Sequence, residues 1–176
     1  MTVTAIHKDP GALTMTLEAE FDASPERVWQ LWADPRQLER WWGPPIYPAT
    51  FTRHDLSVGS RVEYHMTGPE GDQPRGYWDI LEVDPPHRLL VRDGFATDDG
   101  SPNDQMPVGE FTVTIRDAGH GRASMTMESR FPSREAMEQL IAMGQEEGLR
   151  EAVGQIDAIL AEDGVAAAAA SVAAEA

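Results

Sequence analysis

The sequence predicts an α+β domain in which a curved antiparallel sheet of seven strands wraps around one long C-terminal helix. Three observations lead to this fold class. Seven segments between residues 13 and 131 carry strand-like apolar patterns bounded by turn residues. Two short helical segments follow the first of these strands. Apolar or small residues then recur at helical spacing from residue 137 to residue 160, which is typical of one helix with a buried stripe.

The first strand and the two short helices are predicted from local patterns. Segment 13–21 alternates apolar residues with threonine and glutamate, as a half-buried strand does. Two helix start signals follow, in which Ser24 and Asp34 are the N-caps and a proline occupies the first helical position. Gly43-Pro44-Pro45 ends the second helix.

Six further strands are expected in the middle of the chain, at 48–55, 60–67, 77–83, 87–92, 109–116 and 122–131. In the third of these the apolar side chains change parity after Ile80, which a β-bulge explains. Segment 93–107, which contains Asp93, is predicted as a long acidic loop. It is either a solvated surface loop or a mobile lid with Phe95 and Met106 as its apolar contacts.

The final helix contains two unusual glycines. Gly144 and Gly148 lie four residues apart on the apolar stripe, and each costs about 1 kcal/mol relative to alanine in a helix. Either another element packs close to the backbone there, or space is left. We expect residues 1–162 to form one domain and the alanine-rich segment 163–176 to be a flexible tail.

Composition excludes several classes of protein. The 176 residues contain no cysteine, so neither disulfides nor cysteine-ligated metals are possible. None of the five histidines pairs at metal-ligand spacing and no Gly-rich phosphate loop occurs, so no metal site or cofactor is expected. Fourteen basic against thirty acidic residues give a net charge of −16, which opposes binding to nucleic acid or to an anionic membrane. No apolar run is long enough for a signal peptide or a membrane helix. We therefore expect a cytoplasmic protein, either a monomer or a homodimer.

The order of these motifs resembles a known family. Segment 21–44, with Trp41-Trp42-Gly43-Pro44, is similar to the opening signature of START-like (SRPBCC, helix-grip) proteins. Asp84-Pro85-Pro86 and segment 129–160 resemble, more narrowly, the family related to the activator of the 90-kDa heat-shock protein ATPase. The resemblance implies the helix-grip fold over residues 13–161. Leu149 departs from the family pattern, which places tryptophan after the last-helix glycine, and this smaller side chain is expected to reshape the interior.

The resemblance implies a fold with several activities, so three functions remain open. The first is binding of a small apolar molecule between the sheet and the last helix. The second is cyclase or hydrolase chemistry, and the third is a co-chaperone-like or regulatory partnership. The residues expected to line the ligand pocket are Trp42, Phe51, Tyr64, Met66, Trp78, Phe95, Phe111, Met127, Met143, Gly144, Gly148 and Leu149.

Catalysis would require a polar group with a tuned pKa inside the pocket. The candidates are His54, Asp55, Arg61, Tyr64, Asp79 and Glu110. Arg61 and Asp79 are expected to form a cross-strand pair on the outer face of the sheet instead. Tyr64 is the best single candidate because it shares the apolar parity of its strand. The catalytic residues, if any, stay unassigned at this stage.

Overall fold

The computed structural model describes residues 3–175, without the side chains of residues 165–171 and 174–175. The predicted domain's first two residues and the predicted tail's last residue lie outside that range. Eight strands form one antiparallel sheet in the order β1-β2-β8-β7-β6-β5-β4-β3. The strands are β1 (Val3–Asp9), β2 (Thr14–Phe21), β3 (Ala49–Arg53), β4 (Arg61–Met66), β5 (Arg75–Asp84), β6 (Arg88–Ala96), β7 (Gly109–Gly119) and β8 (Arg122–Arg130).

The expected seven strands are all present, and the eighth is β1 at the sheet edge. Its residues pair with β2 as a hairpin, in which the Asp9 carboxylate accepts hydrogen bonds from the backbone of Gly11 and Ala12. The sequence did not predict β1 because the strand is largely exposed and its apolar residues do not alternate cleanly. Pairing with β2, rather than a pattern of its own, makes this segment a strand. The expected bulge in β5 is confirmed, with the register shift between Ile80 and Glu82.

Two short helices follow β2, as predicted. They are α1 (Pro25–Ala33) and α2 (Pro35–Leu38). The hydroxyl oxygen of Ser24 and the carboxylate of Asp34 accept backbone hydrogen bonds from the first turn of each helix. Helix α1 buries Leu31 and Trp32 completely. The two caps therefore position a tryptophan-rich segment against the inner face of the sheet.

The C-terminal segment is not one continuous helix. It consists of α3 (Arg134–Ala142), α4 (Gln145–Gly154) and α5 (Ile156–Glu175). Gly144, with φ of 93°, adopts the left-handed conformation typical of the residue that ends a helix, and the chain turns there into α4. At the second break, the side-chain amide of Gln155 donates a hydrogen bond of 2.8 Å to the carbonyl oxygen of Gly43. The apolar stripe is therefore divided over three segments.

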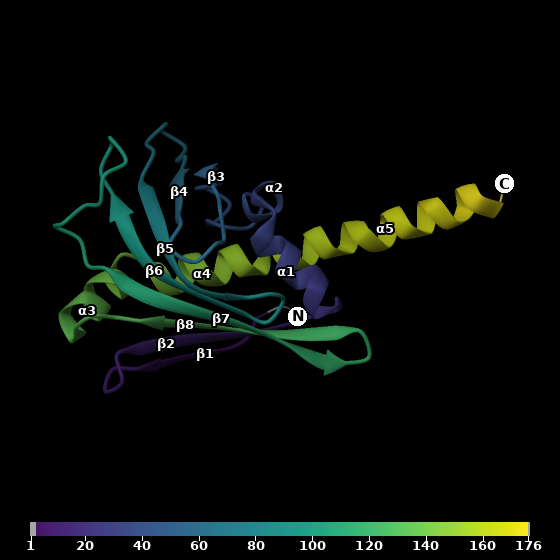
Figure 1. Ribbon diagram of the computed structural model, residues 1–176, viewed down its shortest axis with the longest axis horizontal. Coiled ribbons are helices and arrows are strands. Elements are labelled where there is room, and N and C mark those ends of the chain that lie inside the picture. The colour runs from purple at the N-terminus through teal and green to yellow at the C-terminus, as the bar shows by residue number, and fades with distance from the viewer. Residues whose placement is uncertain (1–2, 176) are drawn as a thin grey trace.

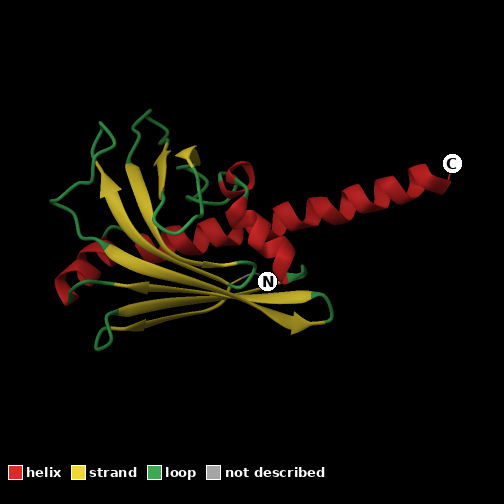
Figure 2. Ribbon diagram, in the orientation of Figure 1, coloured by secondary structure: helices red, strands yellow, loops and turns green. Residues whose placement is uncertain are grey.

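These helices run along one face of a strongly twisted sheet (Figures 1 and 2). Beyond its first turns, α5 extends away from the rest of the molecule (Figure 1). Ion pairs of Arg40 with Glu162 and of Arg27 with Asp163 hold the start of that extension against α1 and the segment that follows α2. The predicted tail from residue 163 is thus helical through residue 175, while its flexibility stays a prediction. No helix among the described residues is long and apolar enough to span a membrane.

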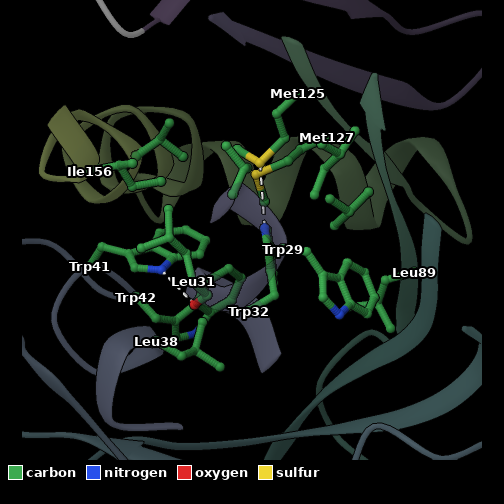
Figure 3. Packing of buried hydrophobic residues seen from close by; sticks show 14 of the residues in the cluster. Trp29, Leu31, Trp32, Leu38, Trp41, Trp42, Leu89, Met125, Met127 and Ile156 are labelled. Atoms are coloured by element: carbon green, nitrogen blue, oxygen red, sulfur yellow. Dashed lines mark hydrogen bonds between the residues drawn. The ribbon is translucent and has the colours of Figure 1, made fainter. Parts of the chain in front are cut away.

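The apolar interior divides into two clusters. The larger one centres on α1, the residues around Trp41 and the inner face of the sheet. In it the Trp32 and Trp41 rings meet edge to face at 4.7 Å, and Trp32 Nε1 lies 3.4 Å from the sulfur of Met125 (Figure 3). The smaller cluster joins α3 to the start of β2 and the end of β8, and it is formed by Met15, Phe131, Met137 and Leu140.

Candidate functional site: a cavity between sheet and helices

A cavity of about 380 Å³ lies between the inner face of the sheet and helices α3 and α4. Its walls come from both apolar clusters, with Trp42 and Phe111 from the larger one and Phe131 and Leu140 from the smaller one. The space therefore lies where the two parts of the core meet, and Leu149 packs against both. A volume of this size is within the range of small-molecule sites.

The structure brings most of the sequence-predicted pocket residues together around this cavity. Ten of them line it: Trp42, Tyr64, Met66, Phe95, Phe111, Met127, Met143, Gly144, Gly148 and Leu149. Phe51 and Trp78 are not in the lining and lie buried behind it in the larger cluster. Their role in binding a ligand stays a prediction.

Gly144, which caps the start of α4, and Gly148 within α4 leave space rather than admit a close neighbour. A Cβ atom built on Gly144 or Gly148 would meet no atom within 4 Å. Gly148 has ordinary helical geometry, so only the missing side chain keeps its position open. Of the two explanations that the sequence allowed, space is the one observed.

Aromatic rings form one wall of the cavity. The Trp42 ring lies 6.2 Å from that of Tyr64, 5.9 Å from that of Phe111 and 4.9 Å from that of Trp78. Tyr64 lies across the backbone of Gly76 on β5, where a Cβ atom would come within 2.5 Å of the phenol oxygen. The glycine therefore sets the position of the Tyr64 ring, because any larger residue would displace it.

Polar groups without partners occur within this apolar wall. Burial raises the pKa of the Tyr64 hydroxyl and the nearby Asp93 carboxylate raises it further, which outweighs the lowering by the adjacent indole N–H groups of Trp42 and Trp78, so this phenol stays neutral. The buried indole Nε1 atoms of Trp42 and Trp78, and the buried Oε1 of Gln145, make no hydrogen bond within the described residues. Buried polar atoms usually have a partner, so these groups are candidates for contact with a ligand.

Asp93 is the site residue that sequence reasoning misplaced. The expected acidic loop 93–107 begins only after Ala96, because β6 continues through Asp93 and Phe95. Asp93 stands opposite Trp78 on β5 and Gly109 on β7, and it lines the cavity. The alternation of Leu89 and Val91, continued by two more residues, would have placed the Asp93 carboxyl on the inner face of the sheet.

The environment of Asp93 changes its acidity. Its carboxyl has neither a hydrogen-bond partner nor a compensating charge among the described residues, and burial raises its pKa from 3.8 to about 7. At neutral pH the cavity therefore contains a carboxyl group that is partly protonated. The other acids of the predicted loop, Asp98, Asp99 and Asp104, are exposed to solvent, as a solvated loop requires.

The remaining acid–base candidates lie elsewhere or at the rim. Arg61 and Asp79 form the expected cross-strand ion pair, with Nε 2.7 Å from Oδ1. His54 Nε2 lies 3.0 Å from the carbonyl oxygen of Trp32, and Asp55 accepts hydrogen bonds from Ser57. These four groups do not line the cavity. Glu110 lines its edge, is 41% exposed and lies 4.0 Å from Arg92.

Comparison with known proteins identifies the family. Residues 22–161 match the family model described as activator of Hsp90 ATPase homolog 1-like protein. The chain belongs to this family. Its fold is that of START-like proteins, so the resemblance seen in the sequence is confirmed. A search of the curated proteins finds no match.

Solved structures of bacterial relatives have the same fold over nearly their whole length. An NMR structure from Arthrobacter aurescens is 48% identical, with a TM-score of 0.88 over 92% of this chain and 93% of that chain. A crystal structure from Mycobacterium smegmatis is 46% identical, with a TM-score of 0.83 over 90% and 96% of the two chains. A family member from Silicibacter pomeroyi, 22% identical with a TM-score of 0.68 over 85% and 99%, shares the fold.

Proposed function

We propose that this protein binds a small, mainly apolar molecule in the cavity between the sheet and α4. The observation that carries the proposal is the cavity itself, which aromatic, methionine and leucine side chains line and two glycines keep open. A cavity that is largely apolar and contains a few convergent polar groups is the usual form of a small-molecule site. Methionine side chains such as Met66 and Met127 adapt to ligands of different shapes.

Binding without conversion is favoured over cyclase or hydrolase chemistry. That chemistry was expected to use a buried, hydrogen-bonded Tyr64, His54 or Arg61 beside the cavity. Of these three, only Tyr64 lines the cavity, whereas His54 and Arg61 are bonded to groups outside it. Asp93, whose pKa is raised by burial, also lines the cavity, but no hydrogen-bond partner among the described residues positions it for catalysis. The described contacts also contain no observation that favours the co-chaperone-like or regulatory alternative.

The proposal is tested with a neutral fluorescent probe, N-phenyl-1-naphthylamine, whose emission rises in apolar surroundings. We expect saturable binding with one site per chain. The Gly148→Phe variant fills open space on the cavity side of α4 and should weaken probe binding at least tenfold.

Gly154→Phe is the matched control. Gly154 lies in the same helix, is exposed and also has no atom within 4 Å of an added Cβ, but it does not line the cavity. This variant should bind the probe like the wild type. Absence of saturable binding, or equal weakening in both variants, would contradict the proposal. Native mass spectrometry of the protein from a cell extract should additionally show a bound small molecule.

A further inference from the structure

Asp93 is the acidic side chain that the inner face of the sheet presents to the cavity. Along β6 it lies between Val91 and Phe95 on the buried parity, and across the ladder it faces Trp78 and Gly109. The Asp93 side chain is half-buried in these apolar surroundings, so its carboxylate has lost part of its hydration and has gained no partner among the described residues. The cost of that burial is relieved when a bound group supplies both a hydrogen bond and a positive charge.

The other titratable groups that line the cavity do not supply Asp93 with a hydrogen bond or a positive charge. Besides Tyr64 on β4 and Asp93 itself, its titratable lining groups are Tyr47 before β3, Glu110 on β7 and Arg130 on β8. The Tyr47 hydroxyl donates to Asp72, and Arg130 is 60% exposed beside Glu128. Helices α3 and α4 contribute no charged lining group, only Gln145 among their polar side chains.

Two further features favour a cation. The rings of Trp42, Tyr64 and Phe111 lie together in the wall, and aromatic faces attract ammonium groups, most strongly when the cation is desolvated. The chain carries a net charge of −16, so its overall field raises the local concentration of cations and opposes anions.

We propose that the cavity selects apolar molecules carrying a protonated primary or secondary amine, which donates a hydrogen bond to the Asp93 carboxylate beside the aromatic wall. This inference rests on the proposed function and specifies its ligand class. The main competitor is an apolar alcohol, because a hydroxyl can donate to Asp93 and also accept from the unpaired Nε1 of Trp42. The experiment therefore compares head groups on one apolar body.

The probes are 2-naphthylmethylamine, 2-naphthylmethanol and 2-naphthoate, titrated into the full chain by calorimetry at about pH 8, where Asp93 is mostly ionised. We expect the amine to bind at least tenfold more tightly than the alcohol and the naphthoate to bind weakest. Asp93→Asn, which keeps the shape and removes the charge, should abolish the preference of amine over alcohol. Asp98→Asn, an exposed acid beyond the same strand, is the matched control and should retain it.

The pH dependence of the wild type provides a readout that needs no variant. At about pH 5.5 the free protein holds a proton on Asp93 that the amine must displace, so amine affinity should fall at least tenfold relative to pH 8. Alcohol affinity should change little.

Equal affinities for the amine and the alcohol, or tighter binding of the alcohol or the naphthoate than of the amine, would overturn the inference while leaving the proposed function intact. Binding of N-phenyl-1-naphthylamine without binding of any naphthyl probe would do the same. Failure of all four compounds would overturn the proposed function as well.

Discussion

The two ends of the interior are built from similar apolar residues but differ in how they are filled. At one end the Trp32 and Trp41 rings meet edge to face, and both side chains are completely buried. At the other end Gly144, which precedes α4, and Gly148 within it face open space, and Met143 is 58% exposed. The filled end stabilises the fold, whereas the hollow end keeps a volume that a ligand can occupy. The difference comes from side-chain size on the helices that cover the sheet.

The largest effect is expected at the filled end. Trp32→Ala should reduce the free energy of unfolding by about 3–5 kcal/mol, because it leaves a large cavity beneath α1. Met143→Ala at the hollow end should change it by less than about 0.5 kcal/mol. Urea denaturation of both variants measures the contrast. The milder Trp32→Phe keeps the test possible if the alanine variant does not fold, and equal effects at the two ends would refute the distinction.

The next effect concerns the buried carboxyl at the hollow end. Because the pKa of Asp93 is raised from 3.8 when unfolded to about 7 when folded, the native state retains a proton that the unfolded state releases in this window. Stability should therefore fall as the pH rises from about 4 to about 7 and stay lowered above it. Asp93→Asn should be more stable than the wild type by about 1–3 kcal/mol at pH 8, and the gain should vanish near pH 4.

Thermal unfolding across pH checks this second prediction. Asp98→Asn, at an exposed position, should follow the wild-type curve. A stability difference that does not depend on pH would show that Asp93 is not held in an apolar environment.

A smaller effect separates the glycines that leave space from those that accommodate a neighbour. Gly148→Ala should raise the free energy of unfolding by about 0.5–1 kcal/mol, since its Cβ meets nothing and alanine favours helix. Gly76→Ala should lower it, because the new Cβ would lie 2.5 Å from the Tyr64 oxygen. Melting temperatures of the two variants should move in opposite directions, and a shift in the same direction would contradict the assigned roles.

The smallest effect is expected from the projecting part of α5. Removal of residues 165–176 should change the free energy of unfolding by less than about 0.5 kcal/mol, because the ion pairs of Glu162 with Arg40 and of Asp163 with Arg27 remain. Hydrogen exchange should show unprotected amides in the removed segment of the full chain if the tail is flexible, as predicted. A large loss of stability would show that this segment docks on the domain.

Elements that carry a local signal were predicted from the sequence. Ser24 and Asp34 precede helices and accept backbone hydrogen bonds where expected, and the parity change at Ile80 marked the bulge in β5. Strand β1 had no such signal, because an exposed edge strand is defined by pairing with β2. The break at Gly144 did have one, since glycine commonly ends helices, but the continuous apolar stripe outweighed it.

The sequence by itself determined the order of the elements, the buried parity of most strands, the family resemblance and ten residues of the cavity wall. These follow from local periodicity, capping and motifs, which neighbouring residues specify. Only the tertiary structure decided that the space beside Gly148 stays open and that Asp93 lies in it without a partner. Both depend on what β5, β7 and α4 bring to the same place, because the environment of a side chain is set by residues far away in the sequence.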